Sequence, residues 1–119
     1  MMGKERGDWG EARVAEYLRA QGCALLAANY RCRFGEIDLI ARDGDMLCFV
    51  EVKLRDRVDY GLPREFVTAT KQRRLRLTAQ HYLATHNPDA LCRFDVAEVY
   101  TDRDFNPAAT RVVYLKNAF

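Results

Sequence analysis

The stretch GEIDLIARDGDMLCFVEVK, which runs from Gly35 to Lys53, holds four ionisable side chains whose types suit the hydrolysis of a phosphate ester. They are Glu36, Asp38, Glu51 and Lys53. Carboxylates without a nearby histidine or thiolate bind hard cations such as magnesium or manganese, and such a cation acidifies a water molecule. A lysine keeps a positive charge near the anion that develops in a transition state. The stretch otherwise reads as two apolar strands around a tight turn, so its charges need an explanation.

The dipeptide Asp43-Gly44 is a strong signal for a two-residue hairpin turn, and it sets the expected pairing of the two strands. In that pairing Asp38 faces Phe49. Because side chains alternate along a strand, the four charged residues emerge on one face of the hairpin. Asp38 and Glu51 become diagonal neighbours, about 7–8 Å apart along the backbone, with side chains free to converge.

The second strand of this hairpin is apolar on both faces, because residues 47–50 read LCFV. Such a run is typical of a central strand that is covered on both sides. Acids at the end of a buried strand repel one another and lose hydration, so they need Lys53, a divalent metal, or both as partners. The alternative is a cross-strand salt bridge at a sheet edge, with Glu36 and Asp38 as surface acids.

A third carboxylate lies in line with the buried face of the first predicted helix. That helix begins near Asp8 as its N-cap and ends before Gly22 as its C-cap. Its inward stripe follows the i, i+3, i+4, i+7 spacing and comprises Glu11, Val14, Ala15 and Leu18. A carboxylate on a buried stripe needs a neutralising partner, which an adjacent metal would supply. Glu11 therefore favours the metal-site interpretation over the salt-bridge interpretation.

The remaining pattern predicts one domain over residues 1–119 with the order helix, three strands, helix, two strands. The first three strands are expected within 24–31, 36–42 and 46–55, before a loop that contains Gly61-Leu62-Pro63. A helix over about 68–85 and strands over 91–100 and 110–115 follow. The fold class is α/β, with a mixed central sheet flanked by helices.

Basic residues gather in the second predicted helix, although the net charge of the chain is only +2. Lys71 and Arg74 share a face of this helix and are candidates for phosphate contacts. The loop after Lys53 extends the same basic track with Arg55, Arg57 and Tyr60. A basic surface beside an acidic pocket is typical of an enzyme that acts on nucleic acid, whereas a helix face kept charged for solubility is the alternative. No base-reading element is apparent, which favours nonspecific or structure-selective binding.

Composition argues against several classes of protein. No apolar stretch approaches the roughly 20 residues that a membrane helix needs. The N-terminal sequence MMGKERGDWGE lacks the apolar core of a secretory signal, so the cytoplasm is the expected location. The four cysteines form no CxxC pair, and neither histidine stands at zinc-finger spacing from one, so a structural zinc site is not expected.

The spacing of the acids resembles the signature of the PD-(D/E)XK nuclease superfamily: Asp38, twelve intervening residues, then Glu51-Val52-Lys53, all after a helix that bears Glu11. Ile37 stands where the superfamily's name has a proline. A wider likeness covers nearly the whole chain. The segments GEARVAEYL, NYRCRFGEIDLI, FVEVKLR, KQRRLRLTAQHYL, RFDVAEV and the closing NAF resemble the YraN-like bacterial family, which is itself similar to archaeal Holliday junction resolvases.

This resemblance implies a restriction-endonuclease-like αβββαβ core and a role for each matching residue. Asp38 and Glu51 would ligate magnesium or manganese, the Val52 carbonyl would add a ligand, and Glu11 would bind the metal directly or through water. Lys53 would orient the attacking water, and Glu36 would be an outer group or a solvent-exposed residue. The implied activity is metal-dependent cleavage of DNA at branched or damaged sites. A homodimer is compatible with this activity. The alternatives are a non-catalytic nucleic-acid-binding module and an interaction protein that retains the fold.

Overall fold

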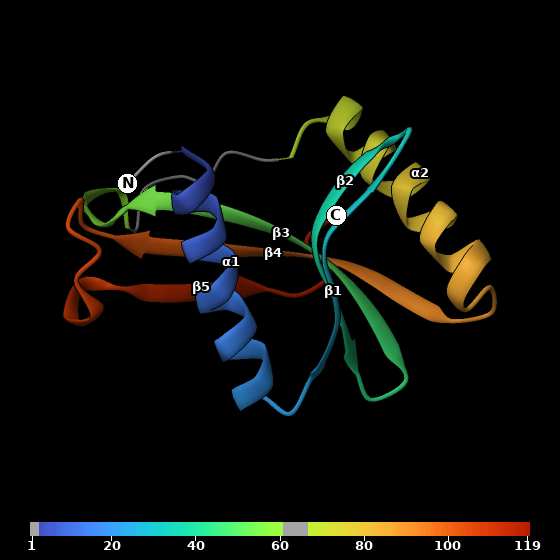
Figure 1. Cartoon of the computed structure of the whole chain (residues 1–119), viewed down its shortest axis with the longest axis horizontal. Helices are drawn as coiled ribbons and strands as arrows, with labels where there is room; N and C mark the ends of the chain where they lie inside the picture. The colour runs from blue at the N-terminus through green and yellow to red at the C-terminus, as the bar shows by residue number, and fades with distance from the viewer. Residues whose placement is uncertain (1–2, 61–66) are drawn as a thin grey trace.

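The computed structural model describes residues 3–60 and 67–119, which form one five-stranded sheet with a helix on each side (Figure 1). In chain order the elements are α1 (Gly3–Ala20), β1 (Ala24–Cys32), β2 (Gly35–Asp43), β3 (Met46–Asp56), η1 (Arg57–Asp59), α2 (Ala69–His86), β4 (Leu91–Thr101), η2 (Pro107–Ala109) and β5 (Arg111–Leu115). The predicted loop at Gly61-Leu62-Pro63 lies outside the described residues. No helix in the described ranges is long and apolar enough to cross a membrane.

The sheet is mixed, as predicted. Its strands lie in the order β1-β2-β3-β4-β5, with β3 and β4 parallel and the other neighbouring pairs antiparallel. Helix α2 forms the crossover between the two parallel strands, which cannot be joined by a tight turn. The arrangement confirms the α/β prediction and is compatible with a restriction-endonuclease-like core.

Helix α1 packs its apolar stripe against one face of the sheet. Val14 and Leu18, one helical turn apart, are buried against apolar side chains of β2, β3 and β4. The helix begins at Gly3, and the predicted start at Asp8 is wrong. Residues 4–6 are Lys, Glu and Arg, which are good helix formers, so the helix continues through the expected cap.

Helix α2 covers the opposite face of the sheet. Its inward residues Leu75, Ala79 and Tyr82 are buried against a cluster that includes Phe49 of β3 and Phe94 of β4. The helix spans residues 69–86, within one residue of the predicted range at each end. The apolar periodicity of this segment was therefore sufficient to predict the element.

The β2–β3 hairpin turns at Gly44-Asp45, one residue later than predicted. Asp43 pairs with Met46, and Gly44 has a φ of +60°, whereas Asp45 has a negative φ. A glycine at the first central position is the requirement of a type II′ turn, in which the second position needs no positive φ. The strand pairing consequently shifts by two residues, and the predicted pairing of Asp38 with Phe49 is wrong.

Strands β2 and β3 separate just before the candidate site. Their pairing ends at Leu39 and Val50, whereas β1 and β2 stay paired as far as Gly35. Gly35, with a φ of +149°, lies so close to α2 that an added Cβ would be 3.3 Å from Thr78 Oγ1. Figure 1 shows this end of the β1–β2 hairpin rising away from β3 towards α2. The separation leaves the edge of β3 unpaired with β2 from Glu51 onwards.

A buried carboxylate joins β4 to β5 and to the C-terminal residues. Asp95 of β4 is fully buried and accepts hydrogen bonds from Arg93 Nε at 3.0 Å, Tyr114 Oη at 2.6 Å and the Asn117 N–H at 2.8 Å. Hydrogen bonds of this kind compensate the cost of burying the charge. Asp95 is therefore a structural residue that keeps the edge strand β5 in place.

We expect Asp95→Ala to lower the free energy of unfolding by about 3–5 kcal/mol, because Arg93 keeps only Asp43 as a carboxylate partner and the donors of Tyr114 and Asn117 lose their buried acceptor. Urea unfolding followed by circular dichroism measures the change. Asp89→Ala, in the exposed turn before β4, is the matched control and should change stability by less than about 0.5 kcal/mol. Equal losses for the two variants would contradict a structural role for the Asp95 hydrogen bonds.

Candidate functional site

Asp38 and Glu51 each lie one residue beyond the last paired residues of β2 and β3, Leu39 and Val50, and both line one cavity. The register of the paired part differs from the predicted one, in which the two acids were diagonal neighbours. Asp38 Oδ2 accepts a hydrogen bond of 2.8 Å from the Val52 N–H. The carboxylate thus satisfies a backbone donor that the departing strand β2 no longer reaches.

The surroundings of Asp38 favour its protonated form. Burial raises the pKa of Asp38 to about 7, and the charge of Glu51 is the second cause. The hydrogen bond from Val52 lowers the pKa, while the charges of Glu11 and Glu36 raise it further. A carboxyl group in this position loses its proton at neutral pH far more readily when a cation lies beside it.

Glu11 reaches the same acidic region from α1. Gly10 is buried above β3, where an added Cβ would lie 3.7 Å from Val52 Cγ1, so this part of the helix runs close to the strand. Burial raises the pKa of Glu11; a hydrogen bond from the Asn29 side chain lowers it, and neighbouring carboxylates, Glu51 among them, raise it. Its Oε1 is buried and has no hydrogen-bond partner among the described residues.

The ammonium group that neutralises Glu51 comes from α2. Lys71 Nζ lies 2.5 Å from Glu51 Oε1, and Glu51 is buried while half of the lysine side chain is exposed. The backbone N–H of Lys71 donates to the side chain of Thr68, the N-cap of the helix, at 3.2 Å. Sequence reasoning gave the neutralising role to Lys53 and placed Lys71 on a phosphate-binding face. The structure instead puts Lys71 among the acids.

The four carboxylates of this region have unequal partners. Glu51 pairs with Lys71, and Glu36 pairs with Arg31 Nε at 2.6 Å. Asp38 and Glu11 form no ion pair with any described residue, and these are the two acids of the group whose pKa is raised. Two uncompensated carboxylates carry the charge that a single divalent cation would balance.

Two neighbouring cavities divide the candidate residues. The Asp38 cavity, of about 410 Å³, is lined by Glu36, Asp38, Glu51, Lys71, Arg74 and Leu75. The Glu11 cavity, of about 490 Å³, is lined by Lys4, Gly7, Asp8, Glu11, Asn29, Arg31 and Glu36. Glu36 lines both cavities. Within residues 3–60 and 67–119, no three acidic, histidine or cysteine side chains converge closely enough to form a ready-made metal site.

The donor chemistry nevertheless fits a hard divalent cation. Asp38 and Glu51 line one cavity, and the charge of Glu11, whose Oε1 is buried without a hydrogen-bond partner among the described residues, acts on Asp38. The Val52 backbone adds a possible carbonyl ligand, because the N–H and C=O of a strand residue point towards the same edge. Oxygen ligands of this kind select magnesium or manganese.

The predicted basic residues occupy three different environments. Lys53 emerges from β3 on the face of Glu51, half-buried and opposite Glu98 of β4, without an ion pair to any described residue. Arg55 belongs to β3, as the predicted strand over 46–55 implies and not to the loop that follows, and its Nε donates to Glu98 Oε2 at 2.7 Å. Arg74 is exposed at the Asp38 cavity. Arg74 is thus accessible to a phosphate, while Arg55 is largely engaged within the sheet.

The ion pair between Lys71 and Glu51 is the feature of the site that the sequence analysis missed. One signal was present: Lys71 lies in the first turn of a helix that has no acidic residue there. The helix dipole disfavours a positive charge at this end, by about 0.3–1 kcal/mol at exposed positions. A lysine in such a place indicates a tertiary partner, and Glu51 is that partner.

We expect Asp38→Asn to stabilise the metal-free protein above neutral pH. The folded protein binds the Asp38 proton more tightly than the unfolded chain does, so wild-type stability falls as the pH rises from about 4 to about 7. Asparagine keeps an acceptor for Val52 and removes the titration. At pH 8 the free energy of unfolding of the variant should exceed that of the wild type by roughly 2–4 kcal/mol.

Urea unfolding between pH 4 and pH 8 in the presence of a chelator measures this difference. Asp45→Asn, in the exposed hairpin turn, is the matched control and should reproduce the wild-type pH profile. A profile for Asp38→Asn that runs parallel to the wild type would show that Asp38 does not titrate in this range.

The chain is similar in sequence to a family of bacterial proteins. The model of "Uncharacterised protein family UPF0102" matches residues 10–99. A UPF0102 protein of Symbiobacterium thermophilum is 48% identical over 99% of this chain and 98% of its own length. Relatives from Pelotomaculum thermopropionicum and Syntrophus aciditrophicus are 44% and 46% identical, each over 95% of this chain and 93% and 87% of their own lengths. The matched range includes both strands of the acidic hairpin and α2, and the chain belongs to the UPF0102 family.

Proposed function

We propose that this protein is a metal-dependent nuclease of the PD-(D/E)XK type that hydrolyses DNA phosphodiesters. The observation that carries the proposal is the position of Asp38 and Glu51, two acids that line one cavity where β2 and β3 separate. Burial of Asp38 and its repulsion by Glu51 raise the pKa of Asp38, so keeping this carboxylate charged costs free energy of folding. Carboxylates with a strongly perturbed pKa that line a cavity are typical of catalytic sites, where acid–base chemistry and metal binding need them.

The metal-binding residues in this proposal are Asp38, Glu51, the Val52 carbonyl and Glu11. Magnesium or manganese, when bound, supplies a Lewis acid and a more acidic water. Asp38 holds its carboxylate in place through the Val52 N–H, so the ligand is oriented before the cation arrives. Glu11 would contribute through its free Oε1, directly or through a water molecule.

Two lysines flank these acids and have distinct roles in the proposal. Lys71 neutralises Glu51 in the metal-free protein, and a cation bound to Glu51 would release its ammonium group towards a phosphate in the same cavity. Lys53 lies two residues beyond Glu51, about 7 Å along the strand, where it can orient the attacking water. Arg74, exposed at the cavity rim, would hold the neighbouring phosphate.

The proposed substrate is DNA recognised by its backbone and its shape. Lys71 and Arg74 offer charge to phosphates, and charge alone does not read base sequence. Branched or damaged DNA in the bacterial cytoplasm exposes strands that a narrow site can reach. Two cuts at a junction would need two copies of the chain, so a homodimer belongs to this proposal.

A non-catalytic nucleic-acid-binding module is the second candidate, and one observation favours it. Lys71 already occupies a carboxylate that a metal would need, and its ammonium group lies 2.5 Å from Glu51. In this alternative the acids serve only to position Lys71 and Arg74 for phosphate contacts. Metal binding and cleavage separate the two candidates.

Magnesium or manganese should raise the melting temperature of the wild type, because a ligand bound only by the folded state stabilises it. At a metal concentration one hundred times Kd the gain is about 2.7 kcal/mol, or roughly 10 °C for a domain of this size. Asp38→Asn should abolish the shift, and the exposed control Asp45→Asn should retain it. No shift in the wild type with either ion would remove the metal site.

Lys53→Ala should reduce metal-dependent cleavage by about 10²–10³-fold, because a charge that stabilises the transition state is lost. Gel analysis of labelled four-way junction, flap and duplex DNA measures the rate. Lys116→Ala, which removes an exposed lysine directly after β5, is the control and should leave the rate unchanged. Metal binding without cleavage of any of these substrates would favour the binding-module alternative.

A further inference from the structure

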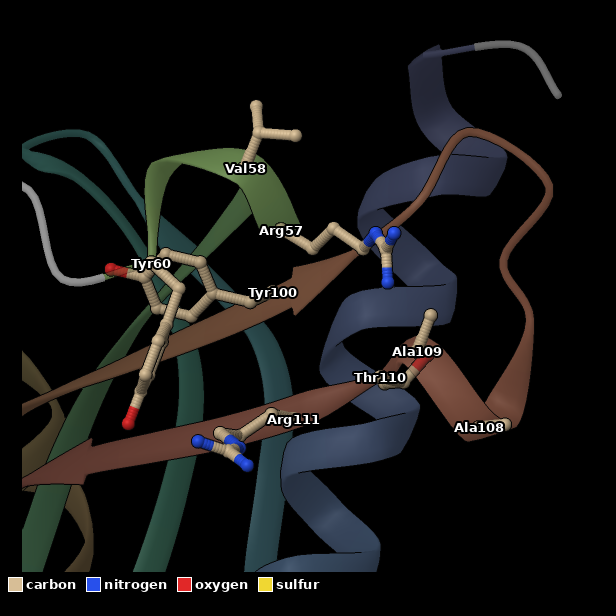
Figure 2. A pocket seen from close by; sticks show the side chains of 8 residues that line it. All are labelled: Arg57, Val58, Tyr60, Tyr100, Ala108, Ala109, Thr110 and Arg111. Carbon is tan, nitrogen blue, oxygen red and sulfur yellow. The ribbon is translucent and has the colours of Figure 1, made fainter.

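A third cavity, of about 440 Å³, lies beyond the acidic site at the far end of β3. It is lined by Arg57, Val58, Tyr60, Tyr100, Ala108, Ala109, Thr110 and Arg111. Figure 2 shows these side chains coming from η1, β4, β5 and the η2 segment, with the ring of Tyr60 beside the guanidinium of Arg111. We call it the Tyr60 cavity. None of its lining residues is acidic, although Asp56 and Asp59 are close in sequence.

The strand register connects this cavity to the acidic site. Lys53 pairs with Glu98, and the next row on the same face contains Arg55, Tyr100 and Arg111, one from each of β3, β4 and β5. Alternate residues of a strand share a face, so Glu51, Lys53 and Arg55 point the same way. At about 3.3 Å per residue, the row of Arg55 lies roughly 13 Å from Glu51. A strand of nucleic acid that leaves the acids along β3 therefore arrives at the Tyr60 cavity.

Two tyrosines, Tyr60 and Tyr100, line this cavity. Tyr100 is buried, and the ring of Tyr60 stands perpendicular to it with a centroid distance of 5.3 Å. Half of Tyr60 remains exposed, so part of its ring is accessible to a ligand. The guanidinium of Arg111 lies 4.7 Å from the Tyr60 centroid and keeps the ring in position. The cation therefore covers one face of the ring, and a ligand would stack on the part of the ring that stays exposed.

Charge completes the arrangement. Arg57 and Arg111 are both exposed, and neither forms an ion pair with a described residue. Asp56 is turned to the backbone, where its Oδ1 accepts from the Val58 N–H at 3.1 Å and caps η1. Two guanidinium groups that form no ion pair with a described residue, next to a half-exposed ring, suit a ligand that combines an anion with a planar ring. A nucleotide has both: its phosphate pairs with arginine and its base stacks on an aromatic side chain.

We propose that the Tyr60 cavity binds one nucleotide of a single-stranded segment of DNA next to the acidic site. The base stacks on Tyr60, and the phosphates on either side contact Arg57 and Arg111. The inference rests on the proposed function only where it assigns this segment to the substrate of that site. A base paired in a duplex has its faces covered by its neighbours, so the cavity selects unpaired strands.

Binding of a short fluorescein-labelled oligothymidylate, followed by anisotropy across a salt series with the metal chelated, tests this inference. Each of Arg57→Gln and Arg111→Gln should weaken binding and reduce the slope of log K against log salt by about 0.7, the value for one contact with a single-strand phosphate. Tyr60→Leu should weaken binding at least fivefold, roughly the loss of one stacked base, and leave the slope unchanged.

Arg19→Gln, at the exposed end of α1, is the matched charge control and should retain the wild-type affinity and slope. Melting temperatures of all variants identify any loss of folding. An affinity of the Arg57→Gln/Arg111→Gln double variant equal to that of Arg19→Gln would overturn the inference. So would wild-type affinity in Tyr60→Leu, because an anion-binding patch without stacking is not a nucleotide site.

The two proposals fail in different ways. If the oligonucleotide behaves as expected but no metal shift or cleavage occurs, the nuclease proposal is lost and the nucleotide site stands. If metal binding and cleavage occur but the Arg57, Tyr60 and Arg111 variants bind as the wild type does, the nucleotide site is lost and the nuclease proposal stands.

Discussion

The hydrogen bond between Asp38 and the Val52 N–H is the interaction on which the acidic site depends. It forms where β2 leaves β3, so a backbone donor that would otherwise bond to the neighbouring strand bonds to a carboxylate instead. The departure of β2 is stabilised elsewhere, by the close contact of Gly35 with α2 and by continued pairing with β1. One structural feature therefore opens the sheet and orients the side chain that lies in the opening.

The distribution of charge follows from this opening. Each carboxylate loses hydration, and the protein compensates only part of the cost: Lys71 and Arg31 neutralise Glu51 and Glu36. Asp38 and Glu11 stay uncompensated within the described part of the chain, which raises the pKa of both. A fold selected for stability alone would replace such residues, because an uncharged side chain costs less to bury. Retained destabilisation of this kind is typical of sites that bind a ligand.

Local patterns predicted most of the elements and the face that each one buries. The spacing of Val14 and Leu18 gave the inward side of α1, and the run LCFV at 47–50 indicated the covered central strand β3. The main error concerned the hairpin turn. Both Asp43-Gly44 and Gly44-Asp45 can occupy the two central positions of a tight turn; the analysis chose the first, whereas the structure uses the second and shifts the pairing by two residues. Since a shift of two preserves the alternation of faces, the acids still share a face and Asp38 still meets Glu51.

The amino-acid sequence by itself determined the α/β order of the elements, the presence of Asp38 and Glu51 on one face of a hairpin, and the amphipathic character of both helices. These properties depend on neighbours within a few residues. Only the tertiary structure decided that Lys71 neutralises Glu51, that Arg55 turns to Glu98, and that Tyr60 meets Arg111. Each of these contacts joins residues about 20 to 50 positions apart, and such pairings depend on how the helix and strands pack, which local periodicity does not encode.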